Sequence, residues 1–182
     1  MIQAGQKLSG GTHPNIFWQC SPIETAELQP TYGLIVAGAS LHWMDWNVVL
    51  PKFGRHLANG GTFAIVSGDA PIKAPWGDQR KSLIADYSTM KNFQWFDMVA
   101  EIEKRKLFKV ENIQLCQPIK ITQSVDDFLK AEHSRSSLSI EAMGPDRANE
   151  FDHKFRAILD PYIKDNTITY PVSTKITWGK PL

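Results

Sequence analysis

An uninterrupted apolar segment, Tyr32–Gly38, is the feature that most constrains the fold, because a helix-length stretch and a second apolar segment, Thr62–Ser67, follow it. Strands that are apolar on both faces are typical of a parallel sheet whose two faces are covered by helices. Between the two segments, apolar residues recur at helical spacing over 46–58, and Gly60 and Gly61 provide a stop signal. The pattern predicts a βαβ crossover in an α/β fold.

Further strand signals flank this unit. Asn15–Cys20 is short, apolar and β-prone, and it follows a turn-forming segment, so we predict a strand there. Residues 108–122 are strand-like but interrupted at Pro118, which predicts a bent edge strand. Residues 167–179 alternate between apolar and polar side chains, unlike the all-apolar first segment. We therefore expect this last strand to be antiparallel to its neighbours.

The remaining segments have helical patterns. Helices are predicted at 2–8, 79–87, 94–107, 124–133 and from Pro145 onward. Ser124 opens a capping box, and Pro145 suits the first turn of a helix. We interpret residues 1–182 as a single domain in which 69–93 and 124–160 form lid or cap segments.

Composition excludes several classes of protein. The chain has 182 residues, with 20 Lys plus Arg against 19 Asp plus Glu, and this near-neutral balance argues against nucleic acid as the main partner. The longest apolar run, Leu34–Ala39, is too short to cross a bilayer. Two cysteines do not make a disulfide framework, so we expect a reducing, cytoplasmic environment. The histidines and cysteines lack the short spacing of a zinc site, and we expect no metal.

Two stretches resemble one family. Tyr32–Trp43, which ends in Leu-His-Trp, and Leu57–Ile65, which contains Asn-Gly-Gly, are similar to the fourth and fifth strands of class I S-adenosylmethionine-dependent methyltransferases. The likeness is closer to the small-molecule branch that includes trans-aconitate-type enzymes. Residues 134–136 and 174–181 resemble the cap insertion and the last strand of such proteins. The resemblance implies a Rossmann-like sheet, S-adenosylmethionine as cofactor and a small-molecule acceptor such as a carboxylate.

The departure from the family pattern is equally informative. Family members begin with a strand and a Gly-rich turn for the methionine end of the cofactor, followed by a strand that ends in an acidic residue for the ribose. The early glycine pair, Gly10 and Gly11, precedes the match to the third strand and follows no apolar strand. The resemblance therefore implies the C-terminal part of a longer protein, short by roughly 60 residues or more. Without the missing strands, Leu34–Ala37 is expected to be an open apolar edge, so that either Asn15–Cys20 pairs directly with it or the edge promotes homo-oligomers or aggregation.

The resemblance places cofactor contacts at two positions. Ser21, Ile23 and Glu24 match the turn against the adenine ring, with polar atoms at its edge and an apolar side chain on its face. Ala37 and Gly38 end the strand where doubly wound sheets bind ligands, and their small size admits a cofactor. For Ser21, Ile23 and Glu24, the alternative is an ordinary turn at the end of a strand. For Ala37 and Gly38, it is close packing of a helix against the strand.

The substrate side is expected to be aromatic. His42 lines the active site or acts as a general base, unless it is a packed histidine that holds the following loop. The walls of the expected substrate pocket are assigned to Trp43, Trp46 and Trp76, with Trp95 and Tyr87 as further candidates. Aromatic faces attract a sulfonium centre such as that of the cofactor. Each of these aromatic residues has core packing as its alternative.

Arg135 is the candidate clamp for a substrate carboxylate, because its guanidinium offers a bidentate fork. Its alternative is an ion pair with Glu132 or Glu141. Three functions remain open at this level. The chain is a small-molecule methyltransferase or part of one, a non-catalytic methyltransferase-like partner subunit, or an unrelated α/β domain.

Overall fold

A computed structural model describes residues 2–29, 31–68, 74–90 and 96–182. Its centre is a four-stranded sheet in the order β1 (Tyr32–Gly38), β2 (Leu57–Ser67), β6 (Lys175–Pro181) and β3 (Phe108–Leu115). Strands β1 and β2 are parallel, whereas β6 is antiparallel to both of its neighbours, β2 and β3. The predicted βαβ unit and the antiparallel last strand are both confirmed.

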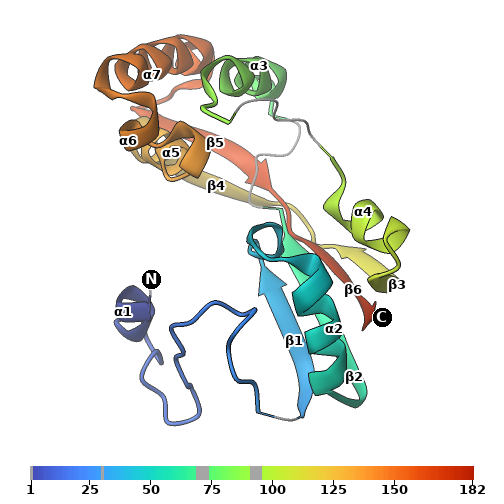
Figure 1. The fold of residues 1–182 in the computed structure, drawn as a ribbon. Helices are drawn as coiled ribbons and strands as arrows, with labels where there is room; N and C mark the ends of the chain where they lie inside the picture. The colour runs from blue at the N-terminus through green and yellow to red at the C-terminus, as the bar shows by residue number, and fades with distance from the viewer. Residues whose placement is uncertain (1, 30, 69–73, 91–95) are drawn as a thin grey trace.

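A two-stranded ribbon extends the sheet. It consists of β4 (Ile119–Ser124) and β5 (Thr167–Val172), which are antiparallel and rise from β3 and β6 into a helical layer (Figure 1). Each of the two predicted long strands is therefore two strands. The break lies at Pro118, which lacks an N–H group, and at Ser173, whose hydroxyl donates to the carbonyl oxygen of Cys116 at 2.7 Å.

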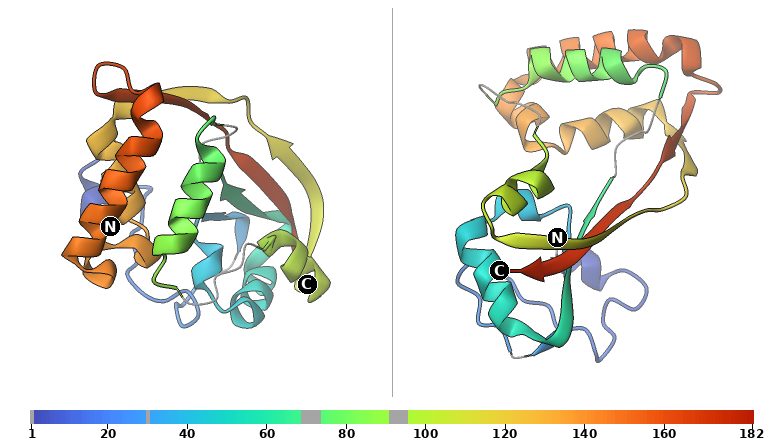
Figure 2. Two further views of the ribbon diagram at one scale, coloured as in Figure 1. Left: turned by 90° about the horizontal axis from the view of Figure 1, so that it is seen from above. Right: turned by 90° about the vertical axis from the view of Figure 1, so that its right-hand side faces the viewer.

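The helical layer packs against one face of the ribbon (Figure 2). It contains α3 (Gly77–Tyr87), α5 (Val125–His133), η2 (Ser136–Leu138), α6 (Ile140–Met143), α7 (Pro145–Leu159) and η3 (Asp160–Tyr162). The Ser124 hydroxyl accepts from the Asp127 backbone N–H at 3.1 Å, and Pro145 opens α7, as predicted. Residues 69–73 of the expected lid lie outside the described residues. Each described helix is too short or too polar to cross a bilayer.

A second group of helices covers one face of the four-stranded sheet. Helices α2 (Trp46–His56) and α4 (Met98–Lys104) lie on the same side (Figure 2). Their Val49, Leu50 and Ile102 are buried against Phe63 and Ile65 of β2, in what we call the sheet cluster. The predicted 94–107 helix is thus shorter than expected, and its residues 94–95 lie outside the described chain.

Strand β1 is an edge strand. Among the described residues it pairs with β2 alone, and on the face away from α2 the side chains of Leu34 and Val36 are 58% and 53% exposed. The expectation of an interior strand with both faces covered is wrong here. The expectation of an open apolar edge fits the observed sheet.

The predicted strand at Asn15–Cys20 is also wrong. No strand is assigned there, and Phe17 is 90% exposed. The segment follows α1 (Ile2–Gln6) and folds back on it, because the Trp18 ring lies against Gly5 of the helix. The Trp18 indole N–H also donates to the Gly11 carbonyl in the intervening turn at 2.8 Å. A β-prone segment without a strand to pair with leaves its backbone to water and local turns.

Gly60 acts in the sheet rather than at the end of the helix. Helix α2 already ends at His56, and Leu57 begins β2. Gly60 has a φ of +79°, and the register with β1 shifts between Leu57 and Thr62. Its left-handed backbone therefore forms a bulge rather than the predicted C-cap.

Candidate functional site

The carboxyl end of β1 is open to a ligand. Gly38 pairs with Val66 of β2, and the next backbone N–H, from Ala39, donates to the Val66 carbonyl at 2.9 Å. Ala39 takes a left-handed φ of +47°, which turns the chain sharply away from the sheet. Ala37 is buried, whereas a Cβ on Gly38 would meet no atom within 4 Å. The strand end therefore has free space at the position where parallel sheets bind ligands.

The Ser21–Glu24 segment is tied to helix α2 and to the residue that precedes it. The Glu24 carboxylate accepts from the backbone N–H of Asp45 at 3.0 Å, just before α2 begins. The Lys52 ammonium of α2 donates to the carbonyl oxygens of Ile23 and Glu24 at 2.9 and 3.1 Å. Ser21 itself is exposed. Ile23 lines a hollow with Tyr32 and Leu34, along the first half of β1, and the Glu24 carboxylate is the group that reaches the loop after the carboxyl end of this strand.

His42 and Trp43 lie in the turn that follows, η1 (Leu41–Trp43). Both side chains are exposed, and their ring centroids are 4.9 Å apart. Within the described chain, no side-chain hydrogen bond holds the His42 ring. A base that nothing orients is poorly placed to remove a proton, so the geometry favours lining over base catalysis.

Trp46 stands at the first position of α2. Its indole N–H donates to the Leu41 carbonyl at 2.8 Å, and its ring lies 6.2 Å from that of Phe96. The Arg105 guanidinium lies 5.2 Å from the centroid of the same ring. Arg105 also donates to Glu101 at 2.8 Å, and this bond lowers the pKa of that carboxyl. Trp46 is thus fixed in orientation near the strand ends.

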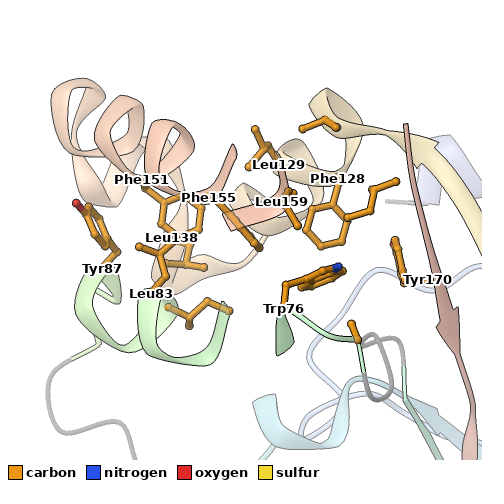
Figure 3. Packing of buried hydrophobic residues seen from close by; sticks show 14 of the residues in the cluster. Trp76, Leu83, Tyr87, Phe128, Leu129, Leu138, Phe151, Phe155, Leu159 and Tyr170 are labelled. Atoms are coloured by element: carbon orange, nitrogen blue, oxygen red, sulfur yellow. The ribbon is translucent and has the colours of Figure 1, made fainter. Parts of the chain in front are cut away.

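Trp76 lies elsewhere, within the helical layer. Its side chain is 1% exposed and packs edge-on against Phe128 at 5.3 Å and Tyr170 at 5.9 Å (Figure 3). It belongs to what we call the helical cluster, which also buries Tyr87 and Phe155. The substrate role expected for Trp76 is therefore replaced by core packing, because its indole faces are covered by other aromatic rings. Trp95 lies outside the described residues.

Arg135 is engaged by an acid. Its Nε lies 3.3 Å from a Glu132 carboxylate oxygen. An ion pair with Glu132 is the alternative to a substrate clamp that the sequence predicts. Glu132 is buried, and Arg80 of α3 donates to it at 2.7, 2.9 and 3.0 Å. The carboxylate therefore lies near two guanidinium groups, but its hydrogen bonds come from Arg80, and the buried Arg135 Nε makes none within the described chain.

A pocket that the sequence reasoning missed borders the carboxyl end of β2. It has a volume of about 490 Å³ and is lined by Ile65, Ser67, residues 96–99 and Lys175. Ser67 and Lys175 lie in predicted strands, 62–67 and 167–179, but the register that pairs the two residues comes from the structure. No group of three or more acidic, His or Cys side chains is gathered for a metal in the described part of the chain.

Comparison with known proteins agrees with this architecture. No family model matches the sequence, and no curated protein matches it significantly. A solved structure of a proposed type II methyltransferase from Anaeromyxobacter dehalogenans is similar with a TM-score of 0.59 and 20% identity, over 92% of this chain and 73% of that one. The chain has a Rossmann-like methyltransferase fold.

A second solved structure supports the same fold. It is that of a proposed methyltransferase from Bacillus halodurans, with a TM-score of 0.51 and 10% identity, over 95% of this chain and 75% of that one. At these identities, the likeness concerns the arrangement of strands and helices. Activity has to be argued from the site itself.

Proposed function

We propose that the chain takes part in methyl transfer from S-adenosylmethionine to a small organic acceptor, as the C-terminal portion of a methyltransferase of the small-molecule branch. The observation that carries the proposal is the open end of β1, where Gly38 is unobstructed, with the Ser21–Glu24 segment tied to α2 through Lys52. A carboxylate is the acceptor that we favour.

The residues present fit one side of the cofactor. We place the adenine ring in the free space at Gly38 and propose Glu24, whose carboxylate reaches the residue before α2, as the acceptor at its edge. The Ile23 side chain lines a hollow with Tyr32 and Leu34, along the first half of β1. The methionine and ribose ends lack their partners. Before β1, the described residues contain helix α1 but no strand followed by a Gly-rich turn. We therefore expect weak cofactor binding by this chain alone.

The proposed roles follow from the chemistry of transfer. When bound, S-adenosylmethionine supplies a methyl group on a positively charged sulfur, and its transfer to a carboxylate oxygen leaves a methyl ester and the neutral thioether. A carboxylate has no proton to lose, so the reaction needs alignment and exclusion of water rather than a base. Trp43 and Trp46 line the approach, and His42 forms part of the wall.

A second function is favoured by the edge of β1. Its seven residues carry no charge, and Leu34 and Val36 are more than half exposed. Edge strands are usually protected by charges, proline or bulges, and a neutral strand can pair with the same strand of a second copy about a twofold axis. The alternative is a non-catalytic methyltransferase-like subunit that associates through this edge.

We also propose a cytosolic location and a small-molecule partner. Both cysteines, Cys20 and Cys116, are free, which suits the cytosol. The near-neutral charge favours small-molecule substrates over nucleic acid.

Titration with S-adenosylhomocysteine, followed by amide chemical shifts, tests the proposed function. We expect weak, saturable shifts that centre on Glu24, Gly38 and Ala39. The Gly38→Val variant, which fills the free space, should abolish them, whereas Gly77→Val, at another open glycine, should not. Shifts elsewhere, or none at millimolar ligand, would favour the non-catalytic subunit.

A further inference from the structure

The pocket at the end of β2 has a mixed lining. Its floor is the buried Ile65 of β2, and its wall is formed by residues 96–99, which lead into α4. Three of its lining residues are polar, namely Ser67, Asp97 and Lys175. Its volume of about 490 Å³ is within the range of small-ligand pockets.

Strand pairing explains why Lys175 faces this pocket. Ile65 pairs with Thr177 and Ser67 pairs with Lys175, so these four residues lie on one face of the sheet. That face is the one covered by α4, since Ile102 packs with Ile65 in the sheet cluster. Lys175 and Ser67 are therefore neighbours on the face that α4 covers.

The pocket adjoins the proposed cofactor end. Val66 pairs with Gly38, and Ser67 is the next residue along β2. Trp46, at the first position of α2, lies 6.2 Å from Phe96 of the pocket wall. An acceptor held here would lie one strand away from the open end of β1.

The acidic residue of the lining, Asp97, already has hydrogen-bond partners. The Asp97 carboxylate accepts from the backbone N–H groups of Val99 and Ala100 at 2.9 and 3.1 Å, which caps α4. In the described residues, no carboxylate lies within 4 Å of the Lys175 ammonium. The lining thus holds one cation, Lys175, and one carboxylate, Asp97, whose oxygen faces the N–H groups of α4. With a single cation, and a helix start occupied by its own cap, the pocket suits a monoanion rather than a phosphate.

We propose that this pocket binds the carboxylate of a small organic acid, through the Lys175 ammonium and the Ser67 hydroxyl. The acid's hydrocarbon body lies against Phe96, Met98 and Val99. The role of this acid as methyl acceptor rests on the proposed function, but its binding does not.

The probe is 3-phenylpropionate, with its neutral amide, 3-phenylpropanamide, as the matched ligand. Titrations of the full chain followed by amide shifts should give saturable changes at Ser67, Val99 and Lys175. A hydrogen bond to a charged group typically accounts for about a 10- to 150-fold difference in affinity, so the amide should bind that much more weakly. Lys175→Ala should lower the affinity for 3-phenylpropionate to that for the amide, and Lys175→Arg should retain most of the affinity for the acid.

Lys120→Ala is the matched control, since Lys120 lies exposed on β4, away from the pocket. It should leave the affinity unchanged. Equal binding of acid and amide, or unchanged binding by Lys175→Ala, would overturn the inference. If the acid binds as expected but S-adenosylhomocysteine gives no shifts at Gly38, the pocket stands and the proposed methyl transfer fails.

Discussion

The Lys52 ammonium donates to the Ile23 carbonyl at 2.9 Å and so ties the segment before β1 to helix α2. It also donates to the carbonyls of Glu24 and Ala26, so its three N–H donors each have a partner. One side chain on helix α2 thus binds three carbonyls of the proposed adenine-side segment, and the Glu24 carboxylate adds a second tie through the Asp45 N–H. This segment has no strand of its own to fix it.

Replacing Lys52 should release that segment. Lys52→Met removes a charged donor from three carbonyls and should lower the free energy of unfolding by about 1–3 kcal/mol. Amides of residues 21–28 should exchange hydrogen faster, whereas those of β2 should not change. Lys81→Met is the control, because Lys81 and its partner Asp78 are exposed. Unchanged exchange at 21–28 would contradict the assigned role of Lys52.

Breaking the buried ion pair should be costly. Glu132→Ala leaves Arg80 without its acid in the helical cluster, and such losses typically cost about 3–5 kcal/mol. The double replacement Arg80→Met with Glu132→Leu should recover most of the stability in urea unfolding. Arg156→Ala, at the exposed pair with Asp126, should cost about 0–1 kcal/mol. A small effect of Glu132→Ala alone would show that Arg80 is not held as described.

Tyr170 should make stability depend on alkaline pH. Burial, and next the negative charge of Glu132, raise the pKa of Tyr170 above its usual value of 10.0. Above about pH 10 the unfolded chain therefore loses this proton while the folded chain keeps it, and stability falls as pH rises. The Tyr170→Phe variant should show a shallower fall in unfolding experiments between pH 9 and 11. Tyr162→Phe, at a more exposed tyrosine, should behave like the unmodified chain.

The β1 edge should govern association. We expect light scattering to show a dimer that Val36→Lys converts to a monomer, because a charged lysine on an edge strand opposes pairing. Val48→Lys, on the exposed side of α2, should leave the dimer intact. A monodisperse monomer of the unmodified chain would contradict edge pairing.

Local patterns predicted the strands and caps well. The apolar run of β1, the alternation before Trp178 and the Ser124 capping box each depend on neighbours in sequence, so the chain itself carries the signal. Whether a strand lies inside a sheet depends on partners distant in sequence. That is why β1 was expected to be covered on both faces, and why 15–20 was expected to be a strand.

The site was harder to predict for a related reason. Aromatic residues serve pockets and cores alike, and only the three-dimensional structure separates Trp46 near the strand ends from Trp76 inside the helical cluster. Lys175 is 108 positions from Ser67 in sequence (175 − 67), and antiparallel pairing makes them neighbours. Pairing of this kind cannot be deduced from either segment alone.

Isothermal titration of the purified chain with S-adenosylmethionine tests the central claim most directly. The residues at Ser21–Glu24 and Gly38 suit the adenine side, and the described residues before β1 supply neither a Gly-rich turn for the methionine end nor a strand-end acid for the ribose. Two missing hydrogen bonds to charged groups amount to about 3–6 kcal/mol, or roughly two to four decades in the dissociation constant. We predict no binding at micromolar concentrations and no methyl transfer by the chain alone. Stoichiometric micromolar binding would contradict the account and show that another part of the chain completes the site.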